Sequence, residues 1–284
     1  MSEQRLYAIV LRLGAMRRGA IPFEHGDQAR AALFDLIKQG DSPLADKLHD
    51  ENGAKPYTIS LLQSGKCDKD GAHHFAEGDS ADWRFSLLLE PAFEALLRKY
   101  LLNRNLPHLR IGALNFAVQD AFASGAGHRD SGHISVMELT ERWNCAPETL
   151  SRRIVLDFRS PTAFNLGQDK ETKEYHIRSN PDAKTIFSAL RKRWAKLGGV
   201  DVGDAFDDWV MKNLELEPIN IYTQKLRVEN RTLTGFIGQV AFRLHGKDLT
   251  YLPYLHLLAD LAFWTGIGYQ TTRGMGQVRR VSTD

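Results

Sequence analysis

The segment GIGYQTTRGMG, residues 266–276, places four glycines in the spacing G-h-G-x5-G-h-G, where h is an apolar residue. Glycine has no Cβ atom and readily adopts positive φ angles, so another chain can approach such a segment closely. Two glycine-rich nucleotide motifs are excluded. The dinucleotide pattern G-x-G-x-x-G fails because residue 271 is threonine, and the P-loop pattern lacks its lysine.

The neighbours of this segment also separate it from nucleotide-cofactor loops. Those loops join a strand to a following helix, whereas this one follows a predicted helix at 250–265 and enters a predicted strand at 274–281. Its N–H groups could bind phosphate oxygens, Arg273 adds charge, and Tyr269 could stack on a base. We therefore predict RNA binding by Gly266, Gly268, Tyr269, Arg273, Gly274 and Gly276. The alternative is a connector that permits tight packing between helix and strand.

The second half of the chain reads as β-α-β-β-α-β. A strand at 153–159 runs into Ser160-Pro161-Thr162, and Asn180 and Pro181 resemble the start of a helix. The remaining elements are strands at about 219–228 and 232–244, joined by a turn at 229–230, then the helix at 250–265 and the strand at 274–281.

The first half repeats this order. The apolar run at 5–13 predicts a buried strand. A helix follows Pro22 and ends at Gly40, which we expect to be a C′ glycine. The later elements are strands at 56–62 and 83–89, a helix that begins at Glu90-Pro91, and a strand at 108–118. The expected class is α+β, with two tandem ferredoxin-like domains. We expect the first domain at 1–127, a linker with a short helix at 128–149, and the second domain at 150–284.

Composition excludes several classes of protein. Among 284 residues, 43% are hydrophobic and 25% are charged, as in ordinary globular proteins. No apolar run is long enough to span a membrane, and the N-terminus is not a signal peptide, so we expect a cytoplasmic protein. Cys67 and Cys145 form no CxxC pair, and the ten histidines include no HExxH motif. We expect neither a metal nor another cofactor.

The net charge of +2 neither requires nor excludes nucleic acid. Basic residues cluster, however, at positions 17–18, 152–153, 191–193 and 279–280, and any one such cluster could be ordinary solvated surface. Lys225, Arg227 and Arg231 lie on the predicted hairpin of the second half. Because apolar Leu226 and Val228 alternate with them, we expect these charges to share one face and to contact an RNA stem.

Five blocks of the sequence, in this order, resemble the RAMP-superfamily endoribonucleases that cut CRISPR precursor RNA. The blocks are IPFEHGDQARAALFDLI (21–37), LADKLHDENGAKPYTISLL (44–62), RIVLDFRSPTAF (153–164), NPDAKTIFSALRKRW (180–194), and the C-terminal stretch 232–280. The resemblance implies two ferredoxin-like domains and metal-independent cleavage beside a repeat hairpin. The ribose 2′-OH would attack the adjacent phosphate, giving 2′,3′-cyclic phosphate and 5′-OH ends. Implied partners are the repeat RNA, a second copy of the chain, and a CRISPR effector complex that receives the product.

The same resemblance implies catalytic residues. His49 and Lys55 match catalytic positions of archaeal-type members, but the matching tyrosine is here Phe34, which has no hydroxyl. Some bacterial members use a second histidine near the start of the first helix, where this chain has His25. We predict His25 and His49 as the acid–base pair, without deciding which is the base, and Lys55 as the group that stabilises the phosphorane.

Two other functions stay open at this point. A non-catalytic RAMP subunit that binds crRNA would share the glycine-rich segment but would need no histidine pair. A tandem ferredoxin-like regulator that binds a small ligand would need neither the glycine-rich segment nor the basic hairpin.

Overall fold

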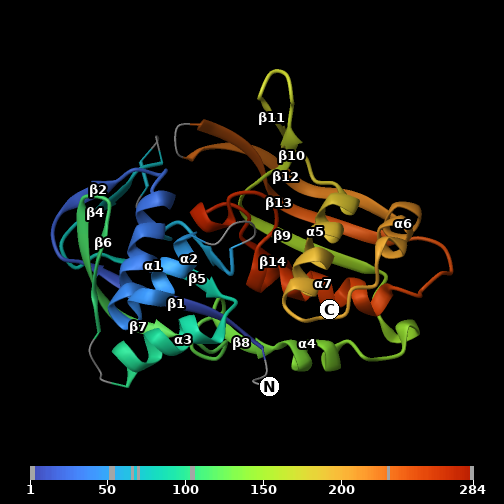
Figure 1. Ribbon diagram of the computed structural model, residues 1–284. Helices are drawn as coiled ribbons and strands as arrows, with labels where there is room; N and C mark the ends of the chain where they lie inside the picture. Colours follow the sequence, from blue (N-terminus) through green and yellow to red (C-terminus); the bar gives the residue numbers. More distant parts are fainter. Residues whose placement is uncertain are drawn as a thin grey trace.

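The computed structural model describes residues 4–50, 55–64, 67–68, 71–102, 106–228 and 231–281. Two halves lie side by side, and α4 runs along the lower edge of the molecule beneath the second half (Figure 1). Within the described residues, no helix is both long and apolar enough to cross a membrane.

The first half is built on an antiparallel sheet in the order β3-β5-β1-β7-β6, and β8 also pairs with β1. Its strands are β1 (Arg5–Ala15), β3 (Tyr57–Ile59), β5 (Ser80–Leu87), β6 (His108–Ile111), β7 (Leu114–Phe122) and β8 (Gly132–Ser135). A separate pair joins β2 (Gly19–Ile21) and β4 (His73–Phe75). The helices are α1 (Gly26–Gly40), α2 (Ser42–Asp50), α3 (Glu90–Leu96) and its π-helical continuation η1 (Leu97–Leu101).

The second half has a four-stranded antiparallel sheet in the order β12-β13-β9-β14 and a separate hairpin, β10–β11. Its strands are β9 (Arg153–Thr162), β10 (Phe164–Gln168), β11 (Tyr175–Arg178), β12 (Leu214–Val228), β13 (Arg231–Leu244) and β14 (Val278–Val281). The helices of this half and of the connection before it are α4 (Val136–Arg142), η2 (Pro147–Thr149), α5 (Ala183–Lys196), α6 (Asp204–Asn213), α7 (Leu252–Thr265) and η3 (Thr271–Arg273).

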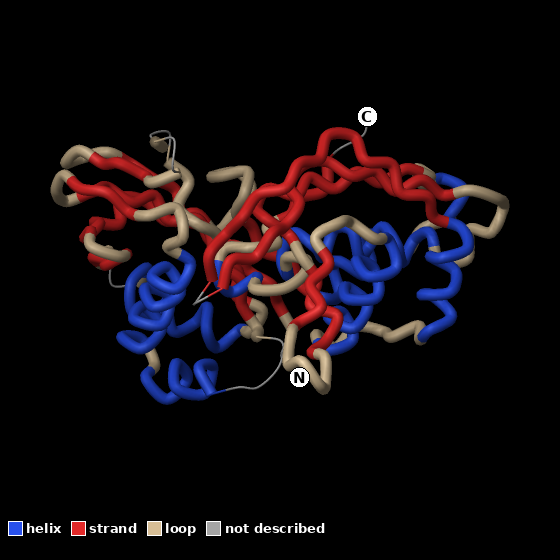
Figure 2. The backbone as a smooth tube through the Cα atoms, turned by 90° about the horizontal axis from the view of Figure 1, so that it is seen from above, coloured by secondary structure: helices blue, strands red, loops and turns tan. Residues whose placement is uncertain are grey.

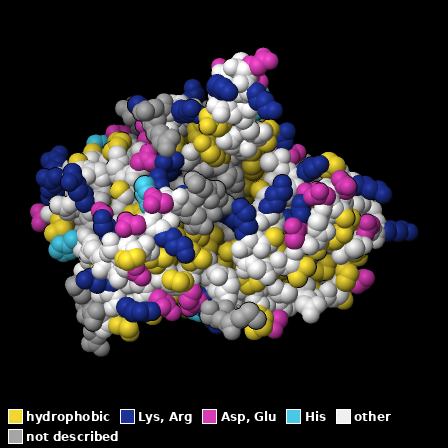
Figure 3. Space-filling model, viewed as in Figure 1, with side chains coloured by type: hydrophobic (Ala, Val, Ile, Leu, Met, Phe, Trp, Pro, Cys, Tyr) yellow, Lys and Arg dark blue, Asp and Glu magenta, His cyan; other side chains and the backbone are white. Residues whose placement is uncertain are grey.

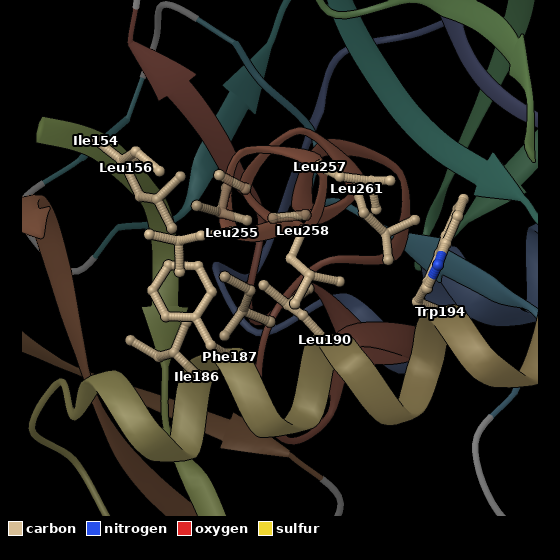
Figure 4. Close-up of a cluster of buried hydrophobic side chains, with 14 of the residues drawn as sticks. Ile154, Leu156, Ile186, Phe187, Leu190, Trp194, Leu255, Leu257, Leu258 and Leu261 are labelled. Carbon is tan, nitrogen blue, oxygen red and sulfur yellow. The ribbon is translucent and has the colours of Figure 1, made fainter. Parts of the chain in front are cut away.

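Both sheets place the first strand of the repeat in the centre, between the third and the fourth. This is the strand order of the ferredoxin-like fold, so the predicted fold class is confirmed. Helices gather on one side of each sheet (Figure 2). In the second half, Phe187 and Leu190 of α5 pack with Leu258 of α7 against Leu156 of β9 (Figure 4).

The two halves share apolar packing. Leu6 and Ala8, on the face of β1 away from α1, belong to the core cluster of the second half. Ile134 of β8 joins the same cluster, although it lies in the stretch that we expected to be a linker. The division at 127 and 150 stays a prediction.

Several predicted boundaries are wrong. The stretch at 108–118 is two strands, because Gly112, at φ +60°, turns the chain back on itself. Helix α5 is capped by the side chain of Asp182, which accepts from the N–H of Thr185, rather than by Asn180. Gly40 ends α1 but does not have positive φ. It is required because a Cβ there would lie 2.6 Å from the backbone oxygen of Ala95.

Other elements were not expected from the sequence. These are α2, α6, the β2–β4 pair and the β10–β11 hairpin. β12 also begins five residues before its predicted start at 219. The predicted turn at 229–230 lies outside the described residues.

Candidate active site

The C-terminal end of α2 brings two of the predicted catalytic residues together. His49 lies in the last turn of the helix, and 67% of its side chain is exposed. Its Nδ1 is 3.1 Å from Oδ1 of Asp50. The Nζ of Lys55 donates to the backbone oxygens of His49 at 2.8 Å and Leu48 at 3.2 Å. Because the last carbonyls of a helix carry partial negative charge, this ammonium group caps α2 and stays beside His49.

His25, the third predicted catalytic residue, has a different environment. It is fully buried just before α1. Its Nδ1 lies 2.7 Å from the Pro22 oxygen, and the N–H of Leu62 donates to Nε2 at 2.8 Å. Because Nε2 accepts, the ring proton must lie on Nδ1. Burial lowers the pKa of His25 to about 4, so the ring is neutral at pH 7. No hydrogen bond or ring contact joins His25 to His49 among the described residues.

Phe34 occupies the position where the resemblance implied a tyrosine. Its ring meets the edge of His49 at 5.8 Å and the edge of Tyr57 at 5.5 Å between centroids. The guanidinium of Arg30, one turn earlier on α1, lies 5.5 Å from the Phe34 ring. Arg30 also donates from Nε to the Tyr57 hydroxyl at 3.1 Å. Burial raises the pKa of Tyr57, so the tyrosine stays protonated and uncharged beside the arginine.

The four glycines of the 266–276 segment all have positive φ, between +63° and +95°. Their neighbours are backbone atoms of the protein or buried and half-buried side chains. A Cβ at Gly276 would lie 2.1 Å from the Ile267 oxygen, and one at Gly268 would lie 2.4 Å from the Ala163 oxygen. Gly266, Gly274 and Gly276 are buried, whereas Gly268 is exposed. Packing within the protein, the alternative interpretation of this segment, therefore explains all four glycines, and Gly268 is the one of the four that is exposed.

Hydrogen bonds fix the same segment to the end of β9. The N–H of Gly276 donates to the Pro161 oxygen at 3.0 Å, and that of Tyr269 to the Ala163 oxygen at 2.8 Å. The N–H of Ile267 closes the loop on the Gly276 oxygen at 2.9 Å. What reaches the surface is a crest at 268–273, in which only Thr271 is buried.

This crest forms one wall of a cleft of about 530 Å³ between the two halves. Arg30 and Lys55 line it from the first half, and α5 lines it from the second. Six of the described lining residues are basic and none is acidic; the basic ones are Arg30, Lys55, Lys192, Arg193, Lys196 and Arg273. Lys and Arg side chains border the hollow between the halves (Figure 3). This concentration of positive charge suits a polyanion.

Hydrogen bonds and close backbone contacts join the two halves beside the cleft. Arg193 donates to the backbone oxygens of Lys55 and Thr265, both at 3.2 Å. Arg273 donates from Nε to Asp27 at 2.6 Å. At the same place, a Cβ on Gly26 would lie 2.1 Å from the Arg273 oxygen, so α1 and the crest touch through their backbones.

Comparison with known proteins identifies the family of this chain. The model of the CRISPR Cas6 N-terminal domain matches residues 6–131, and that of the CRISPR-associated endoribonuclease Cas6 matches residues 156–278. The chain belongs to the Cas6 family. The resemblance inferred from the five sequence blocks is thus confirmed.

Individual relatives agree with this assignment. The CRISPR-associated endoribonuclease Cas6 of Streptococcus thermophilus is 24% identical over 260 residues, covering 90% of this chain and 93% of that protein. A structure described as a Cas6 product complex superposes with a TM-score of 0.79 at 22% identity, covering 99% of this chain and all of the other. Thermus thermophilus Cas6 superposes with a TM-score of 0.71 at 22% identity, with the same coverage. At such identity, the solved structures support the fold.

The hairpin β12–β13 divides the three predicted RNA contacts between two faces. Lys225 and Arg227 are exposed and alternate with buried Leu226 and Val228, as predicted. Arg231 pairs in register with Val228 and not with Arg227, so it points to the opposite face. Its guanidinium lies 4.6 Å from the ring centre of Tyr175 on β11. The expectation of one shared face is wrong for Arg231, because the pairing that follows the turn sets its side.

In two of the basic clusters, some arginines bind other side chains of this Cas6 chain. Arg191 is buried and forms ion pairs with Asp201, Asp204 and Asp207. Arg280 contacts His256 and Asp260, and Arg279 contacts Asp130. These arginines hold elements together, and the positive charge that α5 contributes to the cleft comes from Lys192, Arg193 and Lys196.

Sequence reasoning missed Arg30 and Arg193 as cleft residues. Arg30 precedes Phe34 by one helical turn, so the position matched to a catalytic tyrosine could have identified it. Arg193 has no comparable local signal, because its role depends on the packing of α5 against the first half. Within the described residues, no group of three or more His, Cys, Asp or Glu could hold a metal.

Proposed function

We propose that this chain cleaves CRISPR precursor RNA within its repeats by attack of a 2′-OH on the adjacent phosphate, without a metal ion. Family membership supports the endoribonuclease activity. The single observation that supports a cleavage site here is the basic cleft: Lys55, which lines it together with the glycine-rich crest, also donates to the backbone oxygen of His49 at the end of α2.

The role of His49 follows from its exposed ring. The Asp50 carboxylate accepts from Nδ1–H, which leaves Nε2 with a free lone pair that faces solvent. Nε2 takes the proton of the 2′-OH, O2′ bonds to phosphorus, and the P–O5′ bond breaks. The products are a 2′,3′-cyclic phosphate and a 5′-OH. Lys55 supplies positive charge to the phosphorane, and we assign it the proton that O5′ takes up.

His25 has a supporting role in this proposal. Both of its ring nitrogens are bonded within the protein, and its neutral form is favoured by burial. The proposal therefore departs from the acid–base pair expected from the sequence. His25 positions the turn before α1 against Leu62, and through this turn it supports the backbone contact between Gly26 and the crest.

RNA binding divides between the cleft and the hairpin. Gly268, Tyr269 and Arg273 present the crest to the RNA backbone, while buried Gly266, Gly274 and Gly276 shape it. Lys225 and Arg227 face outward on β12 and would contact an RNA stem. The structures of Cas6 relatives include product and substrate-mimic complexes. We also propose that 1–127 and 150–284 act as domains on either side of the bound RNA.

The test is cleavage of repeat RNA in EDTA, alongside the same RNA with a 2′-deoxy sugar before the scissile phosphate. Cleavage of the first alone, with cyclic phosphate ends, is expected. Tight binding without cleavage would instead identify a non-catalytic crRNA-binding subunit. Sensitivity to EDTA would overturn the metal-independent mechanism.

Further partners belong to the same proposal. Because the substrate is a transcript, we place the reaction in the cytoplasm, with a homodimer and transfer of the product to a CRISPR effector complex as later steps. Light scattering at several protein concentrations tests the dimer. Recovery of cleaved RNA in a reconstituted effector complex tests the transfer.

A further inference from the structure

A second hollow, of about 520 Å³, lies between the β10–β11 hairpin and the crest. Tyr175 and Arg231 line one side of it, and Val228 lies among its apolar lining residues. Tyr269 and Gln270 line both this hollow and the basic cleft, so the two adjoin at these residues. We refer to it as the hairpin pocket. The hairpin projects from the molecule with hydrophobic surface beneath it (Figures 1 and 3).

The side chains of the hairpin pocket suit a nucleobase. Tyr175 is 39% exposed, and the Arg231 guanidinium lies 4.6 Å from the centre of its ring. An exposed aromatic ring beside an apolar surface is how proteins hold unpaired bases. Glu174 also lines the pocket, and its carboxylate would repel a phosphate but could accept from the exocyclic amine of a base.

Gln270, where pocket and cleft meet, has an unusual backbone. Its φ is +58°, a left-handed conformation that is strained for any residue with a Cβ atom. Glycine would make the same turn without strain. The Gln270 Oε1 accepts from Arg273 at 2.8 Å, and Asp27 fixes Arg273 in turn. The amide plane is therefore oriented, and Nε2 has no hydrogen-bond partner among the described residues.

We propose that the hairpin pocket binds one unpaired base of the RNA whose backbone occupies the cleft. Tyr175 stacks on this base, and the amide of Gln270 donates to its edge. The proposal rests on the function proposed above and adds to it a nucleotide-reading site. The position of the pocket beside a basic cleft favours RNA over a peptide as its occupant.

The experiment uses the full chain and repeat RNAs that carry one 2-aminopurine at each unpaired position in turn, with the scissile 2′-OH removed. Stacking on Tyr175 should quench the fluorescence at one position, and Tyr175→Leu should restore it. His176→Ala is the matched control, because His176 is exposed on the same strand and alternates with Tyr175. An abasic nucleotide at that position should weaken wild-type binding about tenfold. In the Tyr175→Leu variant, the abasic nucleotide should cause no further loss of affinity.

A second variant separates recognition from stability. Gln270→Gly removes the amide and relieves the backbone strain, so the melting temperature should stay the same or rise. Its cleavage should no longer distinguish the preferred base at the identified position from other bases. Retained base preference in this variant would refute the role of Gln270.

Cleavage of unmodified repeat RNA is followed in parallel. If the wild type cleaves it but no position responds to Tyr175→Leu, the hairpin pocket is not a base site and the proposed function stands. If the wild type neither binds nor cleaves the repeat, both proposals fail.

Discussion

His25 and His49 lie at the two ends of the α1–α2 region, one just before α1 and the other in the last turn of α2. They are the same residue type with opposite surroundings. His25 is fully buried and bonded through both nitrogens, whereas two thirds of the His49 side chain is exposed. A histidine can exchange protons with a substrate only where a ring nitrogen is free. This difference is why we propose a structural role for the first and a chemical role for the second.

The hydrogen-bond partners of the two histidines explain why their surroundings differ. At His25 the chain enters α1 beneath the segment that follows β3, and Leu62 there directs its N–H at the ring. At His49 the helix simply ends, and the available partner is the neighbouring Asp50. Elements distant in sequence cover the first histidine and leave the second one open.

The largest expected effect is on catalysis at the exposed histidine. His49→Ala should reduce single-turnover cleavage of repeat RNA by about 10²–10⁴, the usual contribution of a general acid or base. Because the ring is exposed, the melting temperature should change little. Asp46→Ala, at an exposed position on the same helix, is the control and should cleave normally. Undiminished cleavage by the His49 variant would remove it from the mechanism.

At the buried histidine we expect the reverse result. His25→Ala leaves a cavity and removes the acceptor of the Leu62 N–H, so the free energy of unfolding should fall by about 2–4 kcal/mol. Urea unfolding measures this loss. Cleavage per folded molecule, assayed well below the unfolding midpoint, should fall far less than in the His49 variant. A stable His25 variant without activity would restore the acid–base pair predicted from sequence.

Acid should destabilise the protein through its buried histidines. Burial lowers the pKa of both His25 and His256 to about 4, whereas an unfolded histidine titrates near 6.5. The unfolded chain therefore binds more protons between these values, and stability is lost as pH falls from about 7 toward 4. Each group should contribute a loss of about 2 kcal/mol between pH 7.5 and 5.

Urea unfolding at the two pH values measures this dependence. His25→Gln should remove about half of the pH-dependent loss of stability that His25 and His256 cause together. His176→Ala, which changes an exposed histidine, should leave it unaltered. An unchanged pH dependence with His25→Gln would mean that His25 does not resist protonation in the folded state.

The fold was predictable from sequence to a large extent because its signals are local. The apolar run at 5–13 and the apolar stripe of α1 each mark a buried face. The order of such strands and helices along each half indicates the ferredoxin-like repeat. The β10–β11 hairpin was missed because its strands are short and exposed, which leaves no apolar alternation to detect.

The site was less predictable, since burial and pairing decide it. His25 matched a catalytic position of bacterial relatives, but no local pattern shows that Leu62 will donate to its ring. Arg231 continued an alternating basic pattern, yet its register with Val228 turns it to the other face. The place of Lys55 in the cleft, and the concentration of basic side chains there, depend on how α5 packs against the first half.

The smallest expected effect concerns what a glycine does at the crest. Gly268 and Gly198 have nearly equal φ, +92° and +89°, so alanine should be strained at both. A Cβ at Gly198 meets nothing within 4 Å, whereas one at Gly268 lies 2.4 Å from the Ala163 oxygen. Gly198→Ala should cost about 1 kcal/mol, and Gly268→Ala about 1 kcal/mol more.

Urea unfolding and RNA affinity, measured together, separate backbone strain from displacement of the crest. If the crest carries RNA, Gly268→Ala should also weaken repeat binding, because the clash moves Tyr269 and its neighbours away from β9. Gly198→Ala, which follows α5 and lies outside the cleft lining, should bind normally. Equal affinities in the two variants, despite unequal stability, would show that RNA does not depend on the position of the crest. The glycines would then serve packing alone, and the basic side chains of α5 and the hairpin would bind the RNA.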